Sequence, residues 1–451
     1  MAEAGSQVGA TVGVVGAGVA GAFVAHFLRE TFEDRVRVAL FERSVRVGGR
    51  VRLIEFEGVS LEAGGKAIHS SNRYMREAIE AFDLPPPAQA HCRRGPGLGV
   101  WNGSSFDFFF TGPPDEFDGR FFARYGRSLV AAGGLVGGMV ESLNAVYERQ
   151  RRGEAWETPE EMLRALGLYD LTQVDGYTYL RDHGISDTFA FEVSDSLARA
   201  NYGQSSAINA FATLVSLAGG GFGGGMAGMA EGGYDRLLER MIEQSGAALH
   251  KGADVRRIEA APAASGGKKY VLRTRDGQAF PCDVVVIATP LELAGIEFQG
   301  VFEEGAALRA FQSTHVTFVL GRLNHSYFGS EPDRLLPDLI LTTENPAIPF
   351  STVGLEAWWP ERKHRVYKLF SREEIKDEVL DAVFVEWVDA TRIVWQAYPV
   401  LLPVAKWPPF RLGPGLYYVN AIESAVSTME TEAIAARNVV NLMAREGMMV
   451  P

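Results

Sequence analysis

The chain has 451 residues, of which 47% are hydrophobic and 22% charged, so it can bury a large core and has the length of about two or three domains. Asp and Glu number 56 against 44 Lys and Arg, and this net charge of −12, without any basic run, excludes a nucleic-acid-binding protein. The two cysteines, Cys92 and Cys282, are too few for a disulfide framework, a four-cysteine zinc site or an iron–sulfur cluster, and we expect no metal.

The first elements predict a βαβ unit. Residues 11–15 are a short run of β-forming residues, and residues 20–29 are rich in Ala and suit a helix. Residues 36–41 predict a second strand that ends at Glu42.

Three glycines between the first strand and the helix carry the strongest local signal. Gly16, Gly18 and Gly21 follow the G-x-G-x-x-G pattern of dinucleotide-binding proteins. The first permits a tight turn, the second lets the backbone approach a pyrophosphate, and the third lets helix and strand pack closely. The N-terminus of the helix offers free N–H groups to phosphates. Glu42 can accept hydrogen bonds from ribose hydroxyls and would repel the 2′-phosphate of NADP.

A second group of glycines follows. Gly48 and Gly49 precede Arg50, and residues 64–65 are another Gly-Gly pair. Paired glycines bring backbone N–H groups against an anion, and Arg50 can add a charged contact.

The next part of the chain predicts helices and one uncharged stretch. Residues 71–84 and 158–166 have helical patterns. Residues 200–230 carry no charge and are long enough to cross a membrane, but they contain polar residues and many glycines. They predict a helix followed by a close-packed loop, and no transmembrane segment.

The alternating pattern returns after residue 230 and predicts most of the remaining strands. The predicted strands are residues 254–258, 270–274, 283–290, 316–322, 365–371 and 416–419. A last helix is predicted from about Thr428, with Ser427 and Glu430 as its capping box and Gly447 at its end.

This pattern resembles the FAD-binding signature of the glutathione-reductase-like flavoproteins related to amine oxidases. In that superfamily a distal strand–turn and a C-terminal strand–helix also hold the flavin, and residues 286–290 and 418–423 match those places. Neither cysteine lies near the C-terminal segment, so we expect FAD to be bound non-covalently. The resemblance implies that the cofactor-binding residues are Gly16, Gly18, Ala20, Gly21, Glu42, Arg43, Gly49, Arg50, Gly65, Val255, Ala288, Glu423 and Met429.

The predicted fold class is α/β. We expect a three-layer, Rossmann-like FAD-binding domain of the amine-oxidase (GR2) type, interleaved with an α+β substrate-binding domain. The FAD-binding domain is predicted to comprise residues 8–90, 231–300 and 395–451, and the substrate-binding domain residues 91–230 and 301–394.

Further motifs in the middle and at the end of the chain resemble the prenylcysteine oxidase (prenylcysteine lyase) family. They are residues 64–69, 199–204, 208–211, 215–217, 231–233, 397–399, 416–423 and 427–438. The matches run from about residue 10 to residue 445, and the middle motifs are not generic to flavoproteins. Lys66 departs from the family pattern, which has a small residue there, and Ala421 stands in place of a glycine.

The resemblance implies an FAD-dependent oxidase that cleaves a thioether. The flavin takes a hydride from the prenyl carbon next to sulfur, water adds, and the adduct collapses to free cysteine and a prenyl aldehyde. Molecular oxygen reoxidises the flavin and gives hydrogen peroxide. The expected partners are therefore a lipid-modified small molecule and oxygen, with peripheral membrane contact a further possibility.

A substrate of this kind needs an apolar channel and a polar site for the cysteine head group. Each buried CH₂ of the tail contributes about 0.8 kcal/mol. Residues 106–110 and 211–229 are candidates for the lining, with ordinary core packing as the alternative. Arg199 or Lys66 is expected to hold the carboxylate and Glu423 or Glu231 the ammonium, unless these residues form structural ion pairs. The predicted substrate-binding residues are Lys66, Arg199, Asn201, Gln204 and Phe211.

Three residues are candidates for proton transfer: His69, Tyr202 and Glu423. His69 follows the second Gly-Gly pair, and a hydrogen-bonded structural histidine is its alternative role. Hydride abstraction from a sulfur-activated carbon does not itself require a base.

Two other functions remain open on the sequence. A flavin amine oxidase or isoprenoid desaturase would share the first 65 residues and the last 40, but not the motif at 199–204. Rab escort and GDP-dissociation-inhibitor proteins use this fold to bind prenylated proteins without flavin, but that class degrades the phosphate-binding glycines, which are intact here.

The N-terminal sequence bears on localisation. Residues 8–28 are apolar, but no Lys or Arg precedes Arg29, and a secretory signal needs a basic segment there. We therefore expect a cytoplasmic protein, whereas animal members of the family carry a secretory signal.

Overall fold

A computed structural model describes residues 9–82, 97–227, 233–262, 267–302 and 309–447. Predictions for Cys92 and Glu231, and for parts of the stretches 71–84 and 211–229, lie outside the described residues.

The dinucleotide-binding part is built on a six-stranded sheet with the order β20-β21-β13-β1-β2-β9. All neighbouring strands are parallel except the pair β20–β21. The strands are β1 (Ala10–Val15), β2 (Val36–Glu42), β9 (Ala248–Lys251), β13 (Val284–Ile287), β20 (Arg411–Gly413) and β21 (Leu416–Tyr418). The four residues of β13 are all fully buried, as expected for a central strand of a covered parallel sheet.

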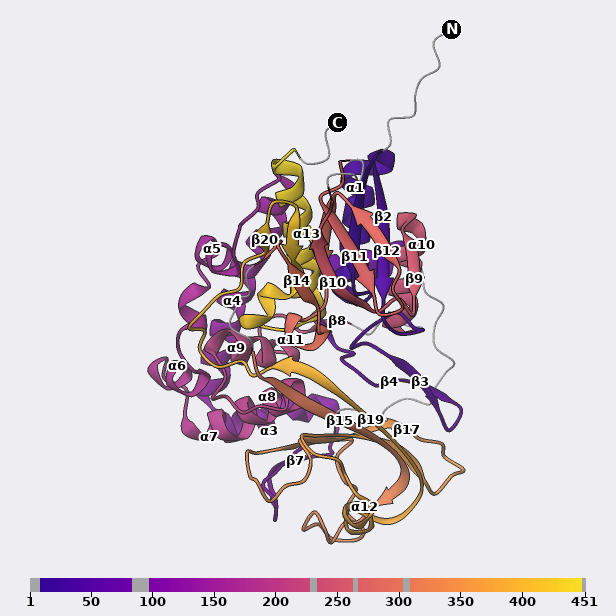
Figure 1. The fold of residues 1–451 in the computed structure, drawn as a ribbon. Coiled ribbons are helices and arrows are strands. Elements are labelled where there is room, and N and C mark those ends of the chain that lie inside the picture. Colours follow the sequence, from indigo (N-terminus) through magenta and orange to yellow (C-terminus); the bar gives the residue numbers. More distant parts are fainter. Residues whose placement is uncertain (1–8, 83–96, 228–232, 263–266, 303–308, 448–451) are drawn as a thin grey trace.

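Helices and a second sheet cover the two faces and complete three layers (Figure 1). Helix α1 (Val19–Phe32) packs against α10 (Tyr234–Ser245) and α13 (Met429–Arg445). A four-stranded sheet covers the other face, where a Cβ on Gly13 would lie 2.7 Å from a methyl of Leu272. Its strands are β10 (Val255–Ala260), β11 (Tyr270–Thr274), β12 (Ala279–Cys282) and β14 (Glu297–Gln299). The predicted Rossmann-like three-layer fold is confirmed.

The second part of the molecule is a seven-stranded sheet with the order β19-β15-β18-β17-β16-β6-β7. Its strands are β6 (Leu98–Trp101), β7 (Phe106–Phe110), β15 (Phe311–Leu323), β16 (Leu339–Thr342), β17 (Thr352–Ala357), β18 (Arg365–Ser371) and β19 (Phe384–Pro399). Helix α12 (Asp377–Val383) packs against β19. The sequence predicts a domain boundary at residue 395. Strand β19 continues past this residue, and its pairing with β15 extends to Pro399.

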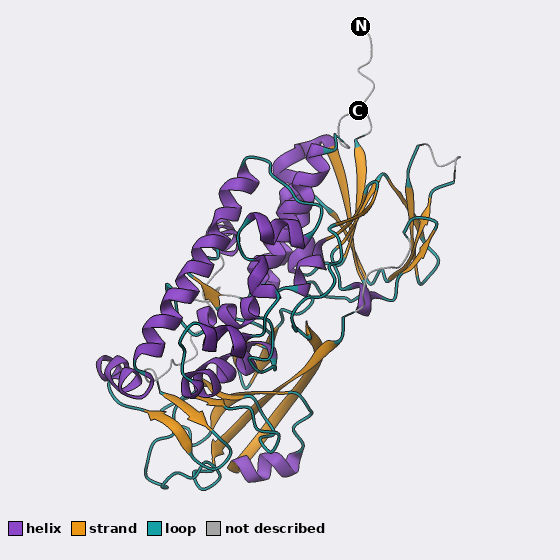
Figure 2. Ribbon diagram, turned by 90° about the vertical axis from the view of Figure 1, so that its left-hand side faces the viewer, coloured by secondary structure: helices purple, strands orange, loops and turns teal. Residues whose placement is uncertain are grey.

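A bundle of helices links the two sheets along one side (Figure 2). The helices are α3 (Pro114–Tyr125), α4 (Arg127–Arg151), α5 (Pro159–Ala165), α6 (Gly176–Asp182), α7 (Asp187–Phe189), α8 (Asp195–Tyr202) and α9 (Ala210–Gly219). Their buried side chains, such as Val136 and Phe211, belong to the same hydrophobic core as Val439 of α13. The bundle is therefore continuous with the dinucleotide-binding part rather than a separate body.

One described helix, α4, is long and apolar enough to cross a membrane, with a mean hydropathy of 1.5 over its most apolar window. This is weak support for a membrane span, because the core helix of a soluble protein passes the same test. Ala132, Val136 and Met139 on one side of α4 are buried in the main core.

Short elements complete the chain between these layers. They are β3 (Leu53–Phe56), β4 (Val59–Glu62), β5 (Ile68–His69), β8 (Met226–Ala227), α2 (Arg73–Phe82), α11 (Leu291–Ala294) and the helical turns at Glu33–Arg35, Tyr169–Thr172, Ala190–Ser194 and Val419–Ser424.

The prediction for the capping of the last helix is wrong. The N-cap of α13 is Thr428, whose hydroxyl accepts from the Thr431 N–H, and the capping box is Thr428 with Thr431. Ser427 instead donates to Glu423, and the Glu430 carboxylate accepts from two N–H groups at the start of α2.

The aromatic run at 106–110 forms β7, and its rings pack in the core, which is the alternative left open by the sequence. Phe108 and Phe110 contact Phe117 of α3, and Phe106 and Phe109 pack against the core of the seven-stranded sheet. None of these residues lines the cavity described below.

Candidate functional site

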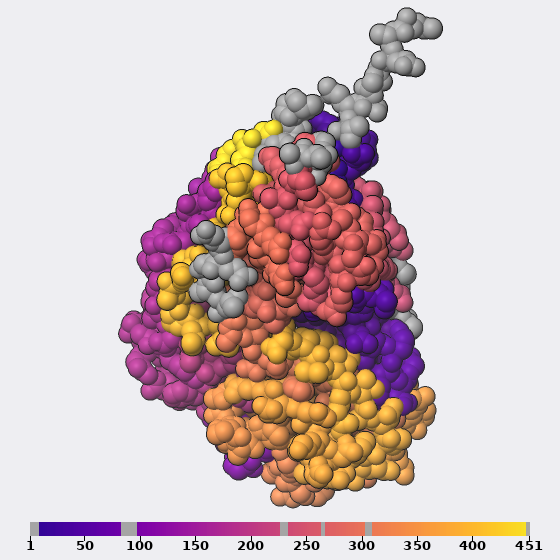
Figure 3. Space-filling view, in the orientation of Figure 1, coloured from indigo at the N-terminus to yellow at the C-terminus, as the bar shows by residue number. Residues whose placement is uncertain are grey.

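A cavity of about 1770 Å³ lies between the dinucleotide-binding sheet, the helix bundle and the seven-stranded sheet. Pockets for a single small ligand usually measure about 300–1,000 Å³, so this volume has room for a dinucleotide and a second molecule. Figure 3 shows the two sheet-containing parts stacked against each other, with residues 50–65 wedged between them.

Each of the three motif positions has a different relation to the protein around it, which decides whether a side chain would fit there. Gly16 has φ +109, and a Cβ there would lie 2.6 Å from the Ala288 carbonyl oxygen. A Cβ on Gly21 would lie 1.9 Å from the Gly16 carbonyl oxygen, so this glycine is required for helix α1 to reach the sheet. A Cβ on Gly18 would meet no protein atom closer than 3.8 Å. The protein itself therefore does not require a glycine at position 18, and the free space belongs to the cavity.

The N-terminus of α1 opens into this space. Gly18 is its N-cap, no side chain caps it, and no acidic residue occupies its first turn. The first N–H groups of the helix are thus available to an anion. The Gly48 N–H donates to the Ala17 carbonyl over 2.9 Å, which brings the second glycine pair beside the first. Gly65 also lines the cavity, and a Cβ there would meet no protein atom within 4 Å.

Glu42 lies at the end of β2 on the cavity wall, as the sequence pattern predicted. Its carboxylate accepts from the N–H groups of Ala17 at 3.0 Å and Ser44 at 2.9 Å. These bonds fix the carboxylate, and its remaining lone pairs are free to accept from hydroxyl groups. Arg43, Ala20, Val255, Ala288 and Met429 also line the cavity.

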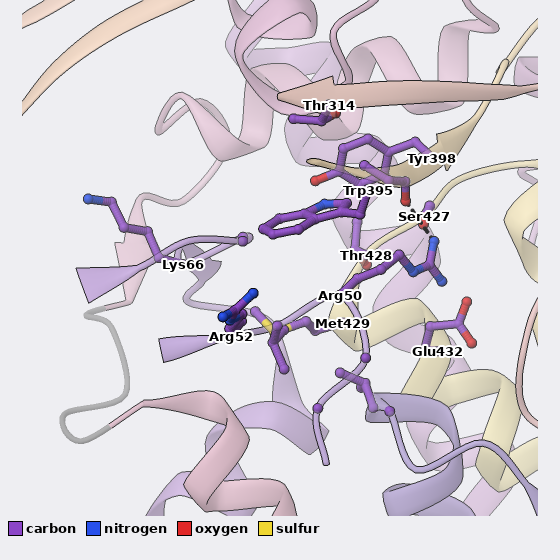
Figure 4. Close-up of a pocket in the computed structure, with 18 of the residues that line it drawn as sticks. Arg50, Arg52, Lys66, Thr314, Trp395, Tyr398, Ser427, Thr428, Met429 and Glu432 are labelled. Atoms are coloured by element: carbon purple, nitrogen blue, oxygen red, sulfur yellow. Dashed lines mark hydrogen bonds between the residues drawn. The ribbon is translucent and has the colours of Figure 1, made fainter. Parts of the chain in front are cut away.

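Arg50 is held by a buried acidic pair at the end of the cavity near α13. Its guanidinium donates to the Ala397 carbonyl over 2.7 Å and forms an ion pair with Glu423. Glu423 is fully buried and does not line the cavity, so its predicted catalytic contact with substrate is not supported by this arrangement. Glu432 does line it, and burial together with the charge of Glu423 raises the pKa of Glu432 well above its usual value. In Figure 4 the Arg50 guanidinium points toward Glu432.

The opposite end of the cavity holds a second charged cluster. Lys66 forms an ion pair with Glu356 of β17, with Nζ 2.5 and 2.6 Å from the two carboxylate oxygens. Lys368 of β18 is 2% exposed, and its Nζ donates to the carbonyl oxygens of Glu62 at 2.6 Å and Gly64 at 3.2 Å. Burial raises the pKa of Glu62 to about 7 and lowers the pKa of Lys368 to about 7. All of these side chains line the cavity.

Three of the predicted substrate-binding residues are engaged within the protein. Arg199 is 3% exposed, and its guanidinium contacts Glu344 at 2.6 Å, the Thr342 hydroxyl and the Phe350 carbonyl. Gln204 binds the backbone of Pro399 and Leu401, and Phe211 is fully buried; neither lines the cavity. These residues were predicted at the substrate because they lie in distinctive motifs. The contacts of Gln204 and Phe211 are within the protein, whereas residues 199–203 line the cavity. Arg199, Asn201 and Lys66 do line the cavity.

Two predicted proton-transfer residues, His69 and Tyr202, also line the cavity. The His69 Nδ1 lies 2.7 Å from the Ser71 hydroxyl and accepts from the Ser71 N–H at 3.2 Å. Burial lowers the pKa of His69 and favours the neutral form of its ring. Burial raises the pKa of Tyr202, whose ring packs edge-on against Tyr398. The roles of both residues stay predictions.

Apolar side chains from both sides surround the space between the two charged clusters. They are Met139, Val140, Leu143, Leu197, Val215 and Ala218 from the helices, and Leu339, Leu341, Leu355, Phe370, Ile393 and Trp395 from the sheet. Figure 4 shows Trp395, Tyr398 and Thr314 reaching the cavity from the sheet side. Sequence reasoning missed Glu356, Lys368 and Trp395, and for Lys368 the only signal was a lysine within an otherwise apolar strand.

Comparisons with known proteins agree with this arrangement. The family described as Prenylcysteine lyase matches residues 118–448, and a Rossmann-like NAD(P)-binding domain matches residues 14–82. The chain is 34% identical to farnesylcysteine lyase of Arabidopsis thaliana over 96% of its length and 88% of the relative's. It is 30% identical to prenylcysteine oxidase 1 of Homo sapiens over 95% and 87% of the two chains.

Solved structures show the same fold at low sequence identity. A putrescine oxidase variant has a TM-score of 0.61 and 14% identity, with 97% of this chain and 100% of that chain covered. Cyclohexylamine oxidase from Brevibacterium oxydans has a TM-score of 0.61 and 15% identity, with 97% and 99% covered.

Proposed function

The chain belongs to the prenylcysteine lyase family, and from that premise we propose that it is an FAD-dependent thioether oxidase acting on S-prenylcysteine. The products would be free cysteine, a prenyl aldehyde and hydrogen peroxide. The observation that carries the proposal is one cavity that joins an open dinucleotide cradle to an apolar space with charged groups at its far end.

The residues of the cradle fit FAD. Gly18 and Gly65 leave space that no protein atom requires, the N-terminus of α1 offers unpaired N–H groups, and Glu42 offers carboxylate lone pairs. The N-terminus of α13 also reaches the cavity wall through Thr428 and Met429, although a side chain caps it and Glu430 and Glu432 lie in its first turn. When bound, FAD would supply the hydride acceptor and the electron transfer to oxygen.

The apolar space suits a prenyl tail. The helix and sheet side chains that line it would exclude bulk water from the prenyl tail, and burial of each CH₂ group contributes about 0.8 kcal/mol. We propose that Lys66 and Glu356 bind the cysteine head group, with Lys66 contacting the carboxylate and Glu356 the ammonium. An amino-acid zwitterion would then exchange one ion pair for two, which limits the cost of opening the pair.

The proposal is tested by loading the protein with FAD and adding S-farnesylcysteine in the presence of oxygen. We expect equal amounts of hydrogen peroxide, free thiol and farnesal, measured by peroxidase-coupled absorbance, thiol titration and mass spectrometry. Amines such as putrescine serve as the matched control.

Each alternative outcome has a distinct reading. Peroxide formed with amines but not with S-prenylcysteines would indicate an amine oxidase instead. Protein that retains no flavin but binds prenylated proteins would indicate the non-enzymatic, escort-like function. A cytoplasmic location remains a proposal. Peripheral membrane contact is also a proposal, and the exposed apolar side chains of Phe122 on α3 and Val130 on α4 are the surface groups that support it.

A further inference from the structure

Lys368 is a buried lysine on the cavity wall that the cofactor cradle does not use. It lies in the middle of β18, opposite Phe318 of β15 and Gly354 of β17. Its Nζ donates to two backbone carbonyls, those of Glu62 and Gly64, just before the segment that carries Gly65 and Lys66. A buried lysine is costly, and one on a cavity wall is often functional rather than structural.

The groups that face Lys368 come from β4, the loop after it, β15, β17 and its own strand, β18. Glu62 lies in β4, Lys66 in the loop after it, and Glu356 in β17. The centroids of the Phe370 and Phe318 rings lie 4.5 and 5.8 Å from Nζ. No carboxylate forms an ion pair with Lys368 in the part of the chain that the structure describes, because Glu356 is engaged with Lys66. Burial and the charge of Lys66 therefore favour the neutral amine, in agreement with a pKa of about 7.

A neutral amine in this geometry has one lone pair that no protein group uses within the described residues. Its two N–H groups are directed to the carbonyl oxygens of Glu62 and Gly64, and the remaining tetrahedral direction holds the lone pair. A lone pair can accept a hydrogen bond from water, whereas an ammonium group cannot. Few basic groups line this cavity: the His69 Nδ1 accepts from the Ser71 N–H, and Lys66 is paired with a carboxylate.

We propose that the Lys368 amine holds the water that adds to the oxidised substrate carbon and takes its proton, a role that rests on the thioether oxidation proposed above. After hydride removal the carbon–sulfur unit is a thiocarbenium cation. Water oxygen bonds to that carbon, one water proton passes to Lys368, and a neutral hemithioacetal results. As the C–S bond breaks, the hydroxyl proton passes to solvent water, and the Lys368 ammonium gives its proton to the leaving sulfur. The proton released to solvent carries away the positive charge of the cation. The released molecules are an aldehyde and a thiol, and Lys368 is again neutral.

If Lys368 has this role, it acts in cleavage of the C–S bond and not in hydride removal, and the two steps can be measured separately. Lys368→Gln keeps an NH₂ group for the two carbonyls but has no basic lone pair, and Lys368→Met is a second variant without donors. Lys251→Met is the matched control, because Lys251 lies on the surface, paired with Glu239. FAD-loaded proteins are mixed with S-farnesylcysteine without oxygen. Loss of flavin absorbance reports hydride removal, and quenched thiol titration reports cleavage of the C–S bond.

We expect Lys368→Gln to bleach the flavin within about threefold of the wild-type rate and to release thiol about 100-fold more slowly, as for loss of a general base. In the wild-type protein thiol release should depend on a group titrating near 7, and the variant should lose that dependence. A readout independent of activity is ¹⁵N NMR of lysine Nζ. We expect one resonance, absent from the Lys368 variants, to titrate near 7 in the FAD-loaded protein.

Three results would overturn this role. Thiol release in both variants could follow bleaching as in the wild type, the variants could slow bleaching or reoxidation by oxygen instead, or the Lys368 resonance could titrate near the usual lysine value. Wild-type protein that is not bleached by any S-prenylcysteine would refute the thioether function itself, which the variants do not decide.

Discussion

The clearest prediction concerns Gly18. A side chain at this position would not clash with the protein, but it would enter the cavity proposed for the cofactor. Gly18→Ala places a Cβ 3.8 Å from the Gly48 carbonyl oxygen and 3.9 Å from the Gly49 Cα, both ordinary contacts. The backbone of Gly18 has φ −85 and ψ −164, which alanine adopts without strain. As an N-cap, alanine is less favourable than glycine by about 1 kcal/mol at most. The flavin-free variant should therefore fold with almost unchanged stability.

Flavin binding should respond very differently. The added methyl group projects into the cavity where the pyrophosphate must approach the backbone. We expect FAD affinity to fall at least about 100-fold, which corresponds to about 2.7 kcal/mol. Gly18→Asp adds a carboxylate to the same place and should abolish binding. Affinity is measured by titrating flavin-free protein with FAD and following quenching of flavin fluorescence, and stability by urea unfolding of the flavin-free protein.

Two other glycines serve as matched controls. Gly21→Ala would bring its Cβ to 1.9 Å from the Gly16 carbonyl oxygen, so the fold itself should lose more than about 3 kcal/mol. Gly134→Ala lies on the open side of α4, where a Cβ meets nothing within 4 Å, and should leave flavin binding unchanged. The reasoning is refuted if Gly18→Ala binds FAD as the wild type does, or if it unfolds as readily as Gly21→Ala.

Three further predictions test the charged groups of the cavity. Between pH 7 and 10.5 the unfolded chain binds more protons at Lys368 than the folded chain does. The free energy of unfolding should therefore rise with pH by up to about 1.4 kcal/mol per pH unit. Urea unfolding at several pH values measures this rise, which Lys368→Met should lack. Arg199→Met should cost about 1–3 kcal/mol of stability, because it removes the hydrogen bonds of the guanidinium to Thr342 and Phe350, while Glu344 keeps its ion pair with Arg372; a raised KM at unchanged stability would instead restore the predicted head-group role. Lys66→Met and Glu356→Gln should each raise KM for S-farnesylcysteine about 10- to 100-fold with flavin content unchanged, since each removes one charge-assisted contact; an unchanged KM in steady-state assays would contradict the head-group assignment.

The dinucleotide cradle could be predicted from the sequence because its parts are local. Strand, glycine turn and helix are contiguous, and the contact that requires Gly21 is with Gly16 in the same turn. The position of Glu42 at the end of β2 follows from the same parallel pairing. The family resemblance extended this prediction to the whole chain, and the fold and family predictions are confirmed.

The substrate side was decided only by tertiary structure. Lys66 and Glu356 lie 290 residues apart in sequence, and Arg199 and Glu344 lie 145 apart, so no local pattern reveals that either pair forms. Whether a charged side chain faces a ligand or is consumed by a partner depends on what packs against it. Arg199 and Lys368 both line the cavity, but Arg199 is paired with Glu344, while Lys368, inconspicuous in its strand, forms no ion pair within the described residues.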